Sequence, residues 1–176
     1  MEASARPRHR GHGMKIDMEP LDRTCAGDLD ACARLMSTSE PWITLGRSED
    51  QSREILRDPN REVTVARVDG GIVGFSIVQM KGPFTGYLQS LLIGPGWRNR
   101  GIGAELLRQA EERVFRDTPN VFVCVSSFNP RARAFYERSG YEEIGEIKEY
   151  IVPGHSEILL RKTRGPLSEF KRNWGL

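Results

Sequence analysis

The chain has 176 residues, 38% hydrophobic and 28% charged, which suits one ordinary globular core and is short for two. Its formal net charge is only +2 at pH 7, with acidic residues among the basic ones, so we expect no nucleic-acid partner and no membrane surface as partner. The three cysteines show no CxxC pair and no metal-ligand spacing, and no apolar run approaches the roughly 18 residues of a membrane helix. These features predict a cytoplasmic protein without a metal site.

The two ends of the chain differ in composition from the rest. Residues 1–13 combine Pro, Gly and Arg with little that could be buried, so we expect a disordered arm, and Met14 is an alternative start. Residues 14–165 are expected to form a single domain, with residues 166–176 as a C-terminal tail.

The first half of the domain predicts a short strand and two helices. Residues 15–21 favour a strand, and residues 24–36 place apolar side chains at helical spacing. Residues 51–56 predict a shorter helix, which Asp58 and Pro59 end. The loop between the helices carries an unusually large apolar residue, Trp42.

The rest of the domain alternates strands with helices. Asp69-Gly70 separates two segments rich in β-branched residues and predicts a hairpin. A helix follows Gly101, and a shorter one lies between Asn129 and Gly140, residues typical of a helix start and end. The pattern predicts an α/β fold with a mixed, mainly antiparallel central sheet flanked by helices. The expected strands are 62–68, 71–80, 85–93, 120–127, 141–152 and 156–163.

Gly101 and Gly103 stand where strand 85–93 gives way to a helix. Without Cβ atoms, they let backbone N–H groups approach a ligand closely, and the first turn of a helix has unpaired N–H donors and a partial positive charge. Arg98 and Arg100 add donors suited to a diphosphate. The stretch therefore predicts a phosphate site; a tight turn with solvated arginines is the alternative.

Two familiar phosphate loops do not fit this stretch. A P-loop needs Lys and then Ser or Thr after its second glycine, whereas Ile102 and Gly103 follow here. The dinucleotide fingerprint needs Gly or Ala where Leu106 stands, and an acidic residue about twenty positions on, which residues 119–128 lack.

The motif Arg98-x-x-Gly101-x-Gly103-Ala104 resembles the pyrophosphate loop of the GNAT superfamily of N-acetyltransferases. The resemblance covers roughly residues 60–163 and extends to Asn129 and Tyr136 on the following short helix. It implies a sheet whose central strands splay apart to hold the pantetheine arm of acetyl-CoA, the co-substrate. It also implies a set of coenzyme-binding residues: Leu92, Ile93, Arg98, Asn99, Arg100, Gly101, Ile102, Gly103, Ala104, Asn129 and Tyr136.

Acetyl transfer to an amine needs a neutral amine, a stabilised carbonyl oxygen and a proton for the leaving thiolate. The resemblance implies that a backbone N–H near Leu92 or Ile93 polarises the thioester, and that Tyr136 is the catalytic acid. Taken alone, Asn129 fits a plain helix cap better than a binding role, and Tyr136 fits a core aromatic residue better than a catalytic one. Cys124 is interpreted as a buried, inert thiol.

The base is not identified, because residues 87–93, where members of the superfamily carry a Glu, contain no carboxylate. Glu40, His155 and Glu157 are candidates, although Glu157 also suits an exposed strand and His155 a turn. We favour a water relay to backbone carbonyls.

The acceptor pocket is expected between the loop 37–48 and the hairpin near 150–157. Acidic and aromatic residues there suit a cationic acceptor. We expect a small amine or amino-acid-like metabolite, with a protein or peptide amine as the alternative and a homodimer left open. A non-catalytic acyl-CoA-binding regulatory module is the alternative of another class. The substrate-binding candidates are Glu40, Trp42, His155 and Glu157.

Overall fold

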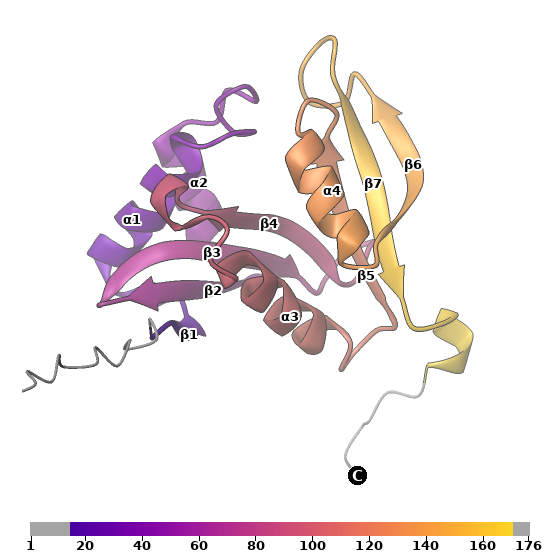
Figure 1. The fold of residues 1–176 in the computed structure, drawn as a ribbon, viewed down its shortest axis with the longest axis horizontal. Helices are drawn as coiled ribbons and strands as arrows, with labels where there is room; N and C mark the ends of the chain where they lie inside the picture. Colours follow the sequence, from indigo (N-terminus) through magenta and orange to yellow (C-terminus); the bar gives the residue numbers. More distant parts are fainter. Residues whose placement is uncertain (1–14, 171–176) are drawn as a thin grey trace, which may run out of the picture.

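A computed structural model describes residues 15–170 of the chain (Figure 1). The predicted arm at residues 1–13 lies outside the described residues, as does the predicted tail from residue 171 onward. The strands are β1 (Asp17–Pro20), β2 (Arg61–Val68), β3 (Gly71–Gln79), β4 (Tyr87–Ile93), β5 (Asn120–Ser126), β6 (Glu142–Lys148) and β7 (Ser156–Thr163). The helices are α1 (Ala26–Ser37), α2 (Glu49–Arg57), α3 (Ile102–Val114) and α4 (Pro130–Arg138), with single 3-10 turns at Pro95–Trp97 and Leu167–Glu169.

The strands form one sheet in the order β1-β2-β3-β4-β5-β7-β6. All neighbours are antiparallel except β4 and β5, which are parallel. The predicted α/β class with a mixed, mainly antiparallel sheet is confirmed. Among residues 15–170, no helix combines the length and the apolar character needed to cross a membrane.

The helices cover the two faces of the sheet in pairs. Apolar residues of α1 and α2 pack with β2, β3 and β4 in one buried cluster, which includes Trp42 from the loop between the helices. Residues of α3 and α4 pack with β3, β4, β5 and β7 in a second cluster on the other face. Figure 1 shows α1 and α2 lying together, apart from α3 and α4. Burial of these apolar faces is the main force that holds the helices on the sheet.

The sheet divides between β4 and β5. Their one paired position is Tyr87 with Phe122, at the start of both strands, so the strands separate toward their C-terminal ends. In Figure 1, β2, β3 and β4 run across the view, whereas β6 and β7 rise steeply. Parallel strands that separate leave their facing N–H and C=O groups free for a ligand.

A β-bulge lies in β4 just where the strands begin to separate. Ile77 pairs with Ser90 and Val78 with Leu88, so Gln89 is the extra residue on β4. A bulge bends its strand and turns the side chains after it toward the opposite face. Leu88 accordingly packs under α3, whereas Leu92 packs on the α1 and α2 side.

Local signals in the sequence position the elements around this division. Asp69 and Gly70 both have positive φ, which confirms the predicted hairpin. Asn129 caps α4 by accepting a hydrogen bond from the Ala132 backbone N–H at 3.1 Å, as predicted. Gly140 ends α4 with a φ of 87°, also as predicted.

Candidate active site

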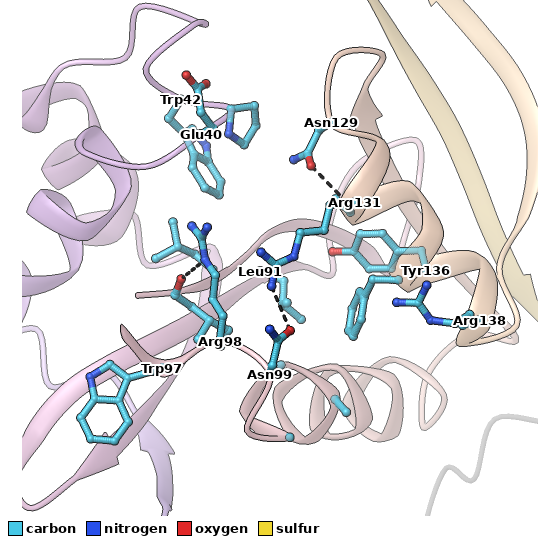
Figure 2. Close-up of a pocket in the computed structure, with 18 residues that line it drawn as sticks. Glu40, Trp42, Leu91, Trp97, Arg98, Asn99, Asn129, Arg131, Tyr136 and Arg138 are labelled. Carbon is cyan, nitrogen blue, oxygen red and sulfur yellow. Dashed lines mark hydrogen bonds between the residues drawn. The ribbon is translucent and has the colours of Figure 1, made fainter. Parts of the chain in front are cut away.

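A first cleft, of about 340 Å³, lies between the C-terminal end of β4, the start of α3 and one side of α4 (Figure 2). Most of the residues predicted to bind a coenzyme line it, together with several that were not predicted. The lining residues are Glu40, Pro41, Trp42, Leu91, Leu92, Ile93, Trp97, Arg98, Asn99, Gly101, Gly103, Ala104, Asn129, Arg131, Ala132, Phe135, Tyr136 and Arg138.

The loop before α3 needs its glycines for two different reasons. Gly101 is the N-cap of α3 with a φ of 81°, a left-handed conformation that favours glycine. Gly103 has ordinary helical φ, and a Cβ built there would lie 3.6 Å from Ile93 and 3.9 Å from Leu91 and Phe135. These are ordinary van der Waals distances, so the fold itself tolerates a side chain at Gly103. A side chain there would take up space in the first cleft.

The start of α3 presents backbone donors to the first cleft. The N–H groups in the first turn of a helix have no partner within the helix. Gly103 and Ala104 line the first cleft, whereas Ile102, also predicted to bind the coenzyme, is 1% exposed, belongs to the core under α3 and is not among the lining residues. The backbone N–H groups at the start of α3 can together bind an anion such as a diphosphate.

Backbone alternation along β4 distinguishes Ile93 from Leu92. The Gly94 N–H donates to the Val73 carbonyl of β3 at 2.8 Å. Since successive N–H groups of a strand point to opposite edges, the N–H of Leu92 also faces β3, and those of Leu91 and Ile93 face the gap toward β5. Ile93 and Leu91 are therefore the positions whose N–H groups can reach a ligand between the strands, and Leu91 was not predicted.

Three arginines line the first cleft, and a fourth, Arg100, lies outside it. Arg98 Nε donates to the Ile93 carbonyl at 3.2 Å, which holds its guanidinium at the cleft. Arg100 lies over the ring of Trp97, 5.1 Å from its centroid, and is not among the lining residues. Arg131 and Arg138 reach the first cleft from α4. Neither residue is among the predicted binding residues, because helical periodicity does not separate exposure to solvent from exposure to a ligand.

Figure 2 shows Arg131 extending from α4 toward Asn99 beside the start of α3. Arg131 donates to Asn99 Oδ1 at 3.0 Å, and Asn99 has a positive φ of 62°. The contact joins the two helices that line the first cleft.

Asn129 and Tyr136, both on α4, present polar groups to the same space. The Oδ1 of Asn129 is engaged by the α4 cap, so its Nδ2 group is the one available to a ligand. The ring of Tyr136 is 5% exposed and packs edge-on against Phe135 and Tyr141. Figure 2 shows the Tyr136 hydroxyl pointing away from α4 into the first cleft.

Burial raises the pKa of the Tyr136 hydroxyl above its ordinary value, and no hydrogen bond from residues 15–170 contributes to this shift. A phenol in this state is protonated at neutral pH and has a donor to offer. This geometry suits the donation of a proton to a ligand in the cleft.

A second cleft, of about 210 Å³, continues from the first on the other side of Trp42 and Tyr136. It lies between the loop before α2, the bulge of β4, and the ends of β5 and β7. Its lining residues are Pro41, Trp42, Leu45, Arg47, Gln79, Tyr87, Gln89, Ser90, Leu91, Val123, Cys124, Val125, Ser126, Asn129, Ala132, Tyr136, Tyr150, Ile151 and Glu157.

Glu157, at the start of β7, is a buried carboxylate in the wall of the second cleft. Its side chain is 6% exposed and accepts a hydrogen bond from Ser126 Oγ at 2.7 Å. Burial raises the pKa of Glu157, and the hydrogen bond from Ser126 opposes part of that rise. The exposed strand position that the sequence suggests for Glu157 is therefore not what the structure shows.

The other acceptor candidates occupy different positions. Trp42 lines both clefts, and Glu40, an exposed residue, lines the first while accepting a hydrogen bond from the Thr44 N–H at 3.2 Å. His155 packs edge-on against Phe128 in the turn before β7 and lines neither cleft. The structure therefore does not bring His155 together with the other predicted residues.

Cys124 lines the second cleft from β5. Cys124 is half-buried, so the fully buried position predicted for it is wrong. Burial still raises the pKa of its thiol, which disfavours the nucleophilic thiolate. Within the described part of the chain, no cluster of His, Cys, Asp and Glu has the geometry to hold a metal ion.

Comparison with known proteins gives one family and several relatives. A family model described as "Acetyltransferase (GNAT) family" matches residues 29–141. N-alpha-acetyltransferase RimI of Mycobacterium tuberculosis is 26% identical over 86% of this chain and 98% of its own length. An aminoglycoside 6'-N-acetyltransferase complexed with coenzyme A aligns with a TM-score of 0.70, at 20% identity, over 85% of this chain and 98% of that one. The ribosomal-protein-S18-alanine N-acetyltransferase of Escherichia coli aligns with a TM-score of 0.68, at 18% identity, over 92% of this chain and 100% of that one.

Proposed function

The chain belongs to the acetyltransferase (GNAT) family, and we propose that it moves an acetyl group from acetyl-CoA to a primary amine by direct attack in a ternary complex. The observation that carries this proposal is the opening of the sheet between β4 and β5, where the glycine loop and the Tyr136 hydroxyl line the same cleft. Acetyl-CoA brings an activated acyl group, and the protein supplies placement, donors and proton transfer.

The first cleft offers a complementary group for each part of acetyl-CoA. The backbone of Gly101, Ile102, Gly103 and Ala104, with Arg98, would bind the diphosphate. The N–H groups of Leu91 and Ile93, together with Asn129 Nδ2, would hold the pantetheine arm between the strands. The Ile93 N–H would then polarise the thioester carbonyl, because it faces the gap and not β3.

Tyr136 is proposed as the general acid. The leaving thiolate needs a proton, and the phenol is protonated at neutral pH because burial raises its pKa. No hydrogen bond from residues 15–170 contributes to this rise, so the hydroxyl is free to donate.

Glu157 is proposed as the proton acceptor for the amine. A free α-amino group has a pKa of about 8 and a lysine amine of about 10, so at pH 7 the acceptor must lose a proton before it attacks. Glu157 and Tyr136 both line the second cleft, so the proposed base and the proposed acid would act on one space. The raised pKa of Glu157 makes this carboxylate a stronger base than an exposed glutamate. We therefore propose a side-chain base in place of the water relay favoured from the sequence.

The acceptor that fits the second cleft is a small amine or an amino-acid-like metabolite. The second cleft is about 210 Å³, with aromatic groups from Trp42, Tyr87 and Tyr150 around a buried carboxylate. Aromatic rings and a carboxylate together bind an ammonium group.

An N-terminal peptide amine is the second candidate. The relative from M. tuberculosis is named an N-alpha-acetyltransferase, and the match covers 98% of that relative and 86% of this chain. A groove next to the second cleft, bounded by Leu45, Gln51, Glu54 and Asp58, would have room for residues that follow an N-terminal amine.

The test is thiol release from acetyl-CoA in the presence of amines, amino acids and peptides. We expect one acceptor class to accelerate thiol release. When both substrates are varied, double-reciprocal plots of the initial rates are expected to give intersecting lines. Parallel lines would contradict direct attack. Coenzyme binding without release for every acceptor would favour a non-catalytic acyl-CoA-binding module.

A further inference from the structure

Arg47 stands in the wall of the second cleft, in the turn just before α2. Its backbone N–H donates to the Trp42 carbonyl at 3.0 Å, which fixes Arg47 close to this aromatic residue in the fold. Arg47 lines both the second cleft and the adjoining groove, so this residue lies where the two meet.

Arg47 has no anionic partner in residues 15–170. Its Nε–H group is buried and has no hydrogen-bond acceptor. No carboxylate of the described chain forms an ion pair with Arg47. Two other partly buried arginines are neutralised, since Arg53 pairs with three carboxylates and Arg67 with two. Burial and the nearby charge of Arg61 lower the pKa of Arg47. Since a half-buried charge without a counter-ion is costly, the site is suited to an anion from elsewhere.

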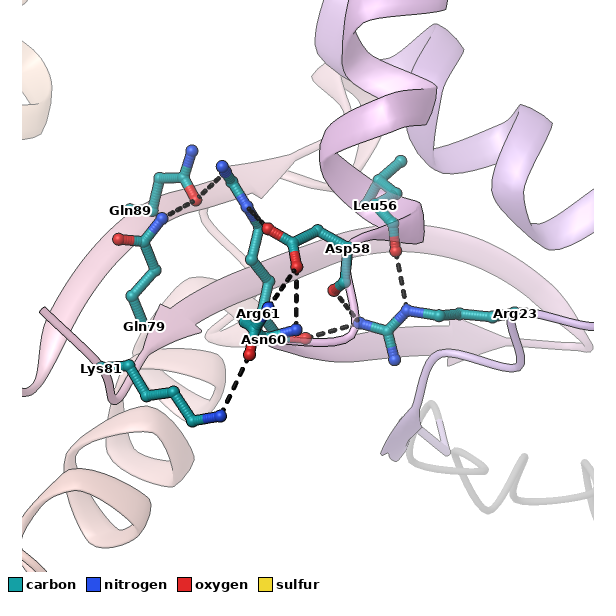
Figure 3. Close-up of polar contacts among 8 residues, drawn as sticks. All are labelled: Arg23, Leu56, Asp58, Asn60, Arg61, Gln79, Lys81 and Gln89. Atoms are coloured by element: carbon teal, nitrogen blue, oxygen red, sulfur yellow. Dashed lines mark hydrogen bonds and ion pairs between the residues drawn. The ribbon is translucent and has the colours of Figure 1, made fainter.

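Gln89, the bulge residue of β4, supplies a second donor in the same cleft (Figure 3). Its Oε1 accepts from Arg61 and, at 3.0 Å, from Gln79. A guanidinium can only donate, so Arg61 fixes which end of the Gln89 amide it faces. Arg61 is itself held by Asp58 at 3.0 Å.

The Nε2 group of Gln89 is therefore left without an acceptor among residues 15–170. Figure 3 shows this nitrogen pointing away from the Gln79 and Arg61 contacts. The bulge thus places an amide donor, oriented by its neighbours, in the wall that also holds Arg47.

The second cleft consequently offers both a negatively charged group and a positively charged group to a ligand. Glu157, on β7, offers a buried carboxylate beside Ser126 of β5. Arg47 and Gln89, from the α2 turn and the β4 bulge, offer a cation and an amide donor. A ligand that complements both carries an ammonium group and an anionic group on one small framework.

We propose that the acceptor carries a carboxylate a few bonds from the amine that receives the acetyl group, and that Arg47 and Gln89 bind this carboxylate. The inference rests on the proposed function, which it deepens by naming the acceptor class. The carboxylate can be that of a free amino acid or an acidic side chain near the N-terminus of a peptide. A polyamine does not fit, because its second ammonium would meet Arg47.

The experiment compares amines that differ only in the anionic group. One pair is a free amino acid and its amide; the other is a short peptide with glutamate in second position and the same peptide with glutamine. We expect the wild type to prefer the carboxylate member of one pair by about tenfold or more in kcat/KM. The pair that shows the preference identifies the source of the carboxylate.

Arg47→Gln is expected to remove this preference by raising KM for the carboxylate member, with kcat and the rate on the amide little changed. Arg47→Lys keeps the charge and is expected to retain part of the preference. Arg116→Gln is the matched control, since Arg116 is exposed and lines neither cleft. Calorimetry with the N-acetylated amino acid and its amide, in the presence of coenzyme A, gives a binding readout that needs no turnover.

Three outcomes would overturn the inference while leaving acetyl transfer intact. The first is an equal kcat/KM for both members of each pair, and the second is a preference for polyamines. The third is an Arg47→Gln variant in which kcat/KM falls equally for both members of a pair. Failure of every amine to release coenzyme A would instead contradict the proposed function itself, and the inference would fall with it.

Discussion

The Tyr136 hydroxyl is the donor on which the proposed chemistry depends. Tyr136→Phe removes it and keeps the ring that packs against Phe135 and Tyr141. We expect turnover to fall by about 10² or more, with acetyl-CoA affinity and thermal stability unchanged, because the hydroxyl has no hydrogen bond to lose within residues 15–170. Single-turnover rates, calorimetry and thermal unfolding check the three parts. Turnover at the wild-type rate, where chemistry limits the rate, would remove Tyr136 from the mechanism.

Glu157 makes a prediction about pH. Because burial raises its pKa, the carboxylate becomes protonated at a higher pH than an exposed glutamate, and kcat/KM is expected to fall there as pH decreases. Glu157→Gln should lower kcat/KM by about 10² to 10⁴ and abolish this acidic limb.

The same substitution gives a stability control. A raised pKa in the folded state means that Glu157 contributes stability when protonated, which is lost as pH rises through that pKa. At pH 7 Glu157→Gln should therefore unfold at the same temperature as the wild type or higher, since Gln can still accept from Ser126. An acidic limb that persists in the variant would show that another group titrates.

At the scale of single residues, the sequence identifies groups but not their surroundings. Asn129 is recognisable as a helix cap from its type and position, and the structure confirms the cap. The burial of Glu157 depends on a long-range pairing of β7 with β5, which no local pattern reports. The same holds for Leu91, whose backbone direction depends on strand pairing and on the bulge at Gln89.

The two glycines at the start of α3 are needed for different reasons: Gly101 for its backbone conformation, and Gly103 for the space that it leaves in the first cleft. Gly101→Ala should destabilise the fold by about 1 to 2 kcal/mol, because its φ is 81°. Gly103→Val should leave stability nearly unchanged and weaken coenzyme A binding by about tenfold or more, because the new side chain extends into the first cleft. Chemical denaturation and calorimetry distinguish the two. Unchanged coenzyme affinity in Gly103→Val would refute the proposed role of the loop.

The arginines of this loop are expected to differ. Arg98 lines the first cleft, whereas Arg100 lies over Trp97 outside it. Arg98→Ala should therefore weaken coenzyme A binding by about tenfold, and more than Arg100→Ala does. Added salt should weaken wild-type binding and affect Arg98→Ala less. If neither salt nor either substitution changes the affinity for coenzyme A, the two arginines are solvated surface residues and do not bind the coenzyme.

At the scale of elements, hydrophobic period and turn residues carry most of the prediction. Strands rich in β-branched residues, the Asp69-Gly70 hairpin and the start of α4 are confirmed with small shifts at their ends. The predicted strand 141–152 is shorter, ending at Lys148, because its last residues form the turn toward β7. Such ends depend on pairing partners, and propensity alone does not fix them.

At the scale of the whole molecule, the opening between β4 and β5 creates the site. The sequence predicts the α/β class, and resemblance implies the splayed strands, but the polar asymmetry of the second cleft is not readable from the chain. Arg47, Gln89 and Glu157 come from three distant segments that meet only when the sheet is assembled. The absence of a counter-ion for Arg47 among residues 15–170 could not be predicted from the residue types in the loop before α2, because it depends on which segments the fold brings close to Arg47.

The measurement that tests the central claim most directly follows the acetyl group itself. The protein is incubated with isotopically labelled acetyl-CoA and the best acceptor from the amine panel, and both protein and acceptor are analysed by mass spectrometry. The proposal predicts one labelled acetyl group on the acceptor amine and none on the protein, with much slower labelling by Gly103→Val. A labelled protein, for example at Cys124, or an unlabelled acceptor despite bound coenzyme, would contradict direct transfer in this cleft.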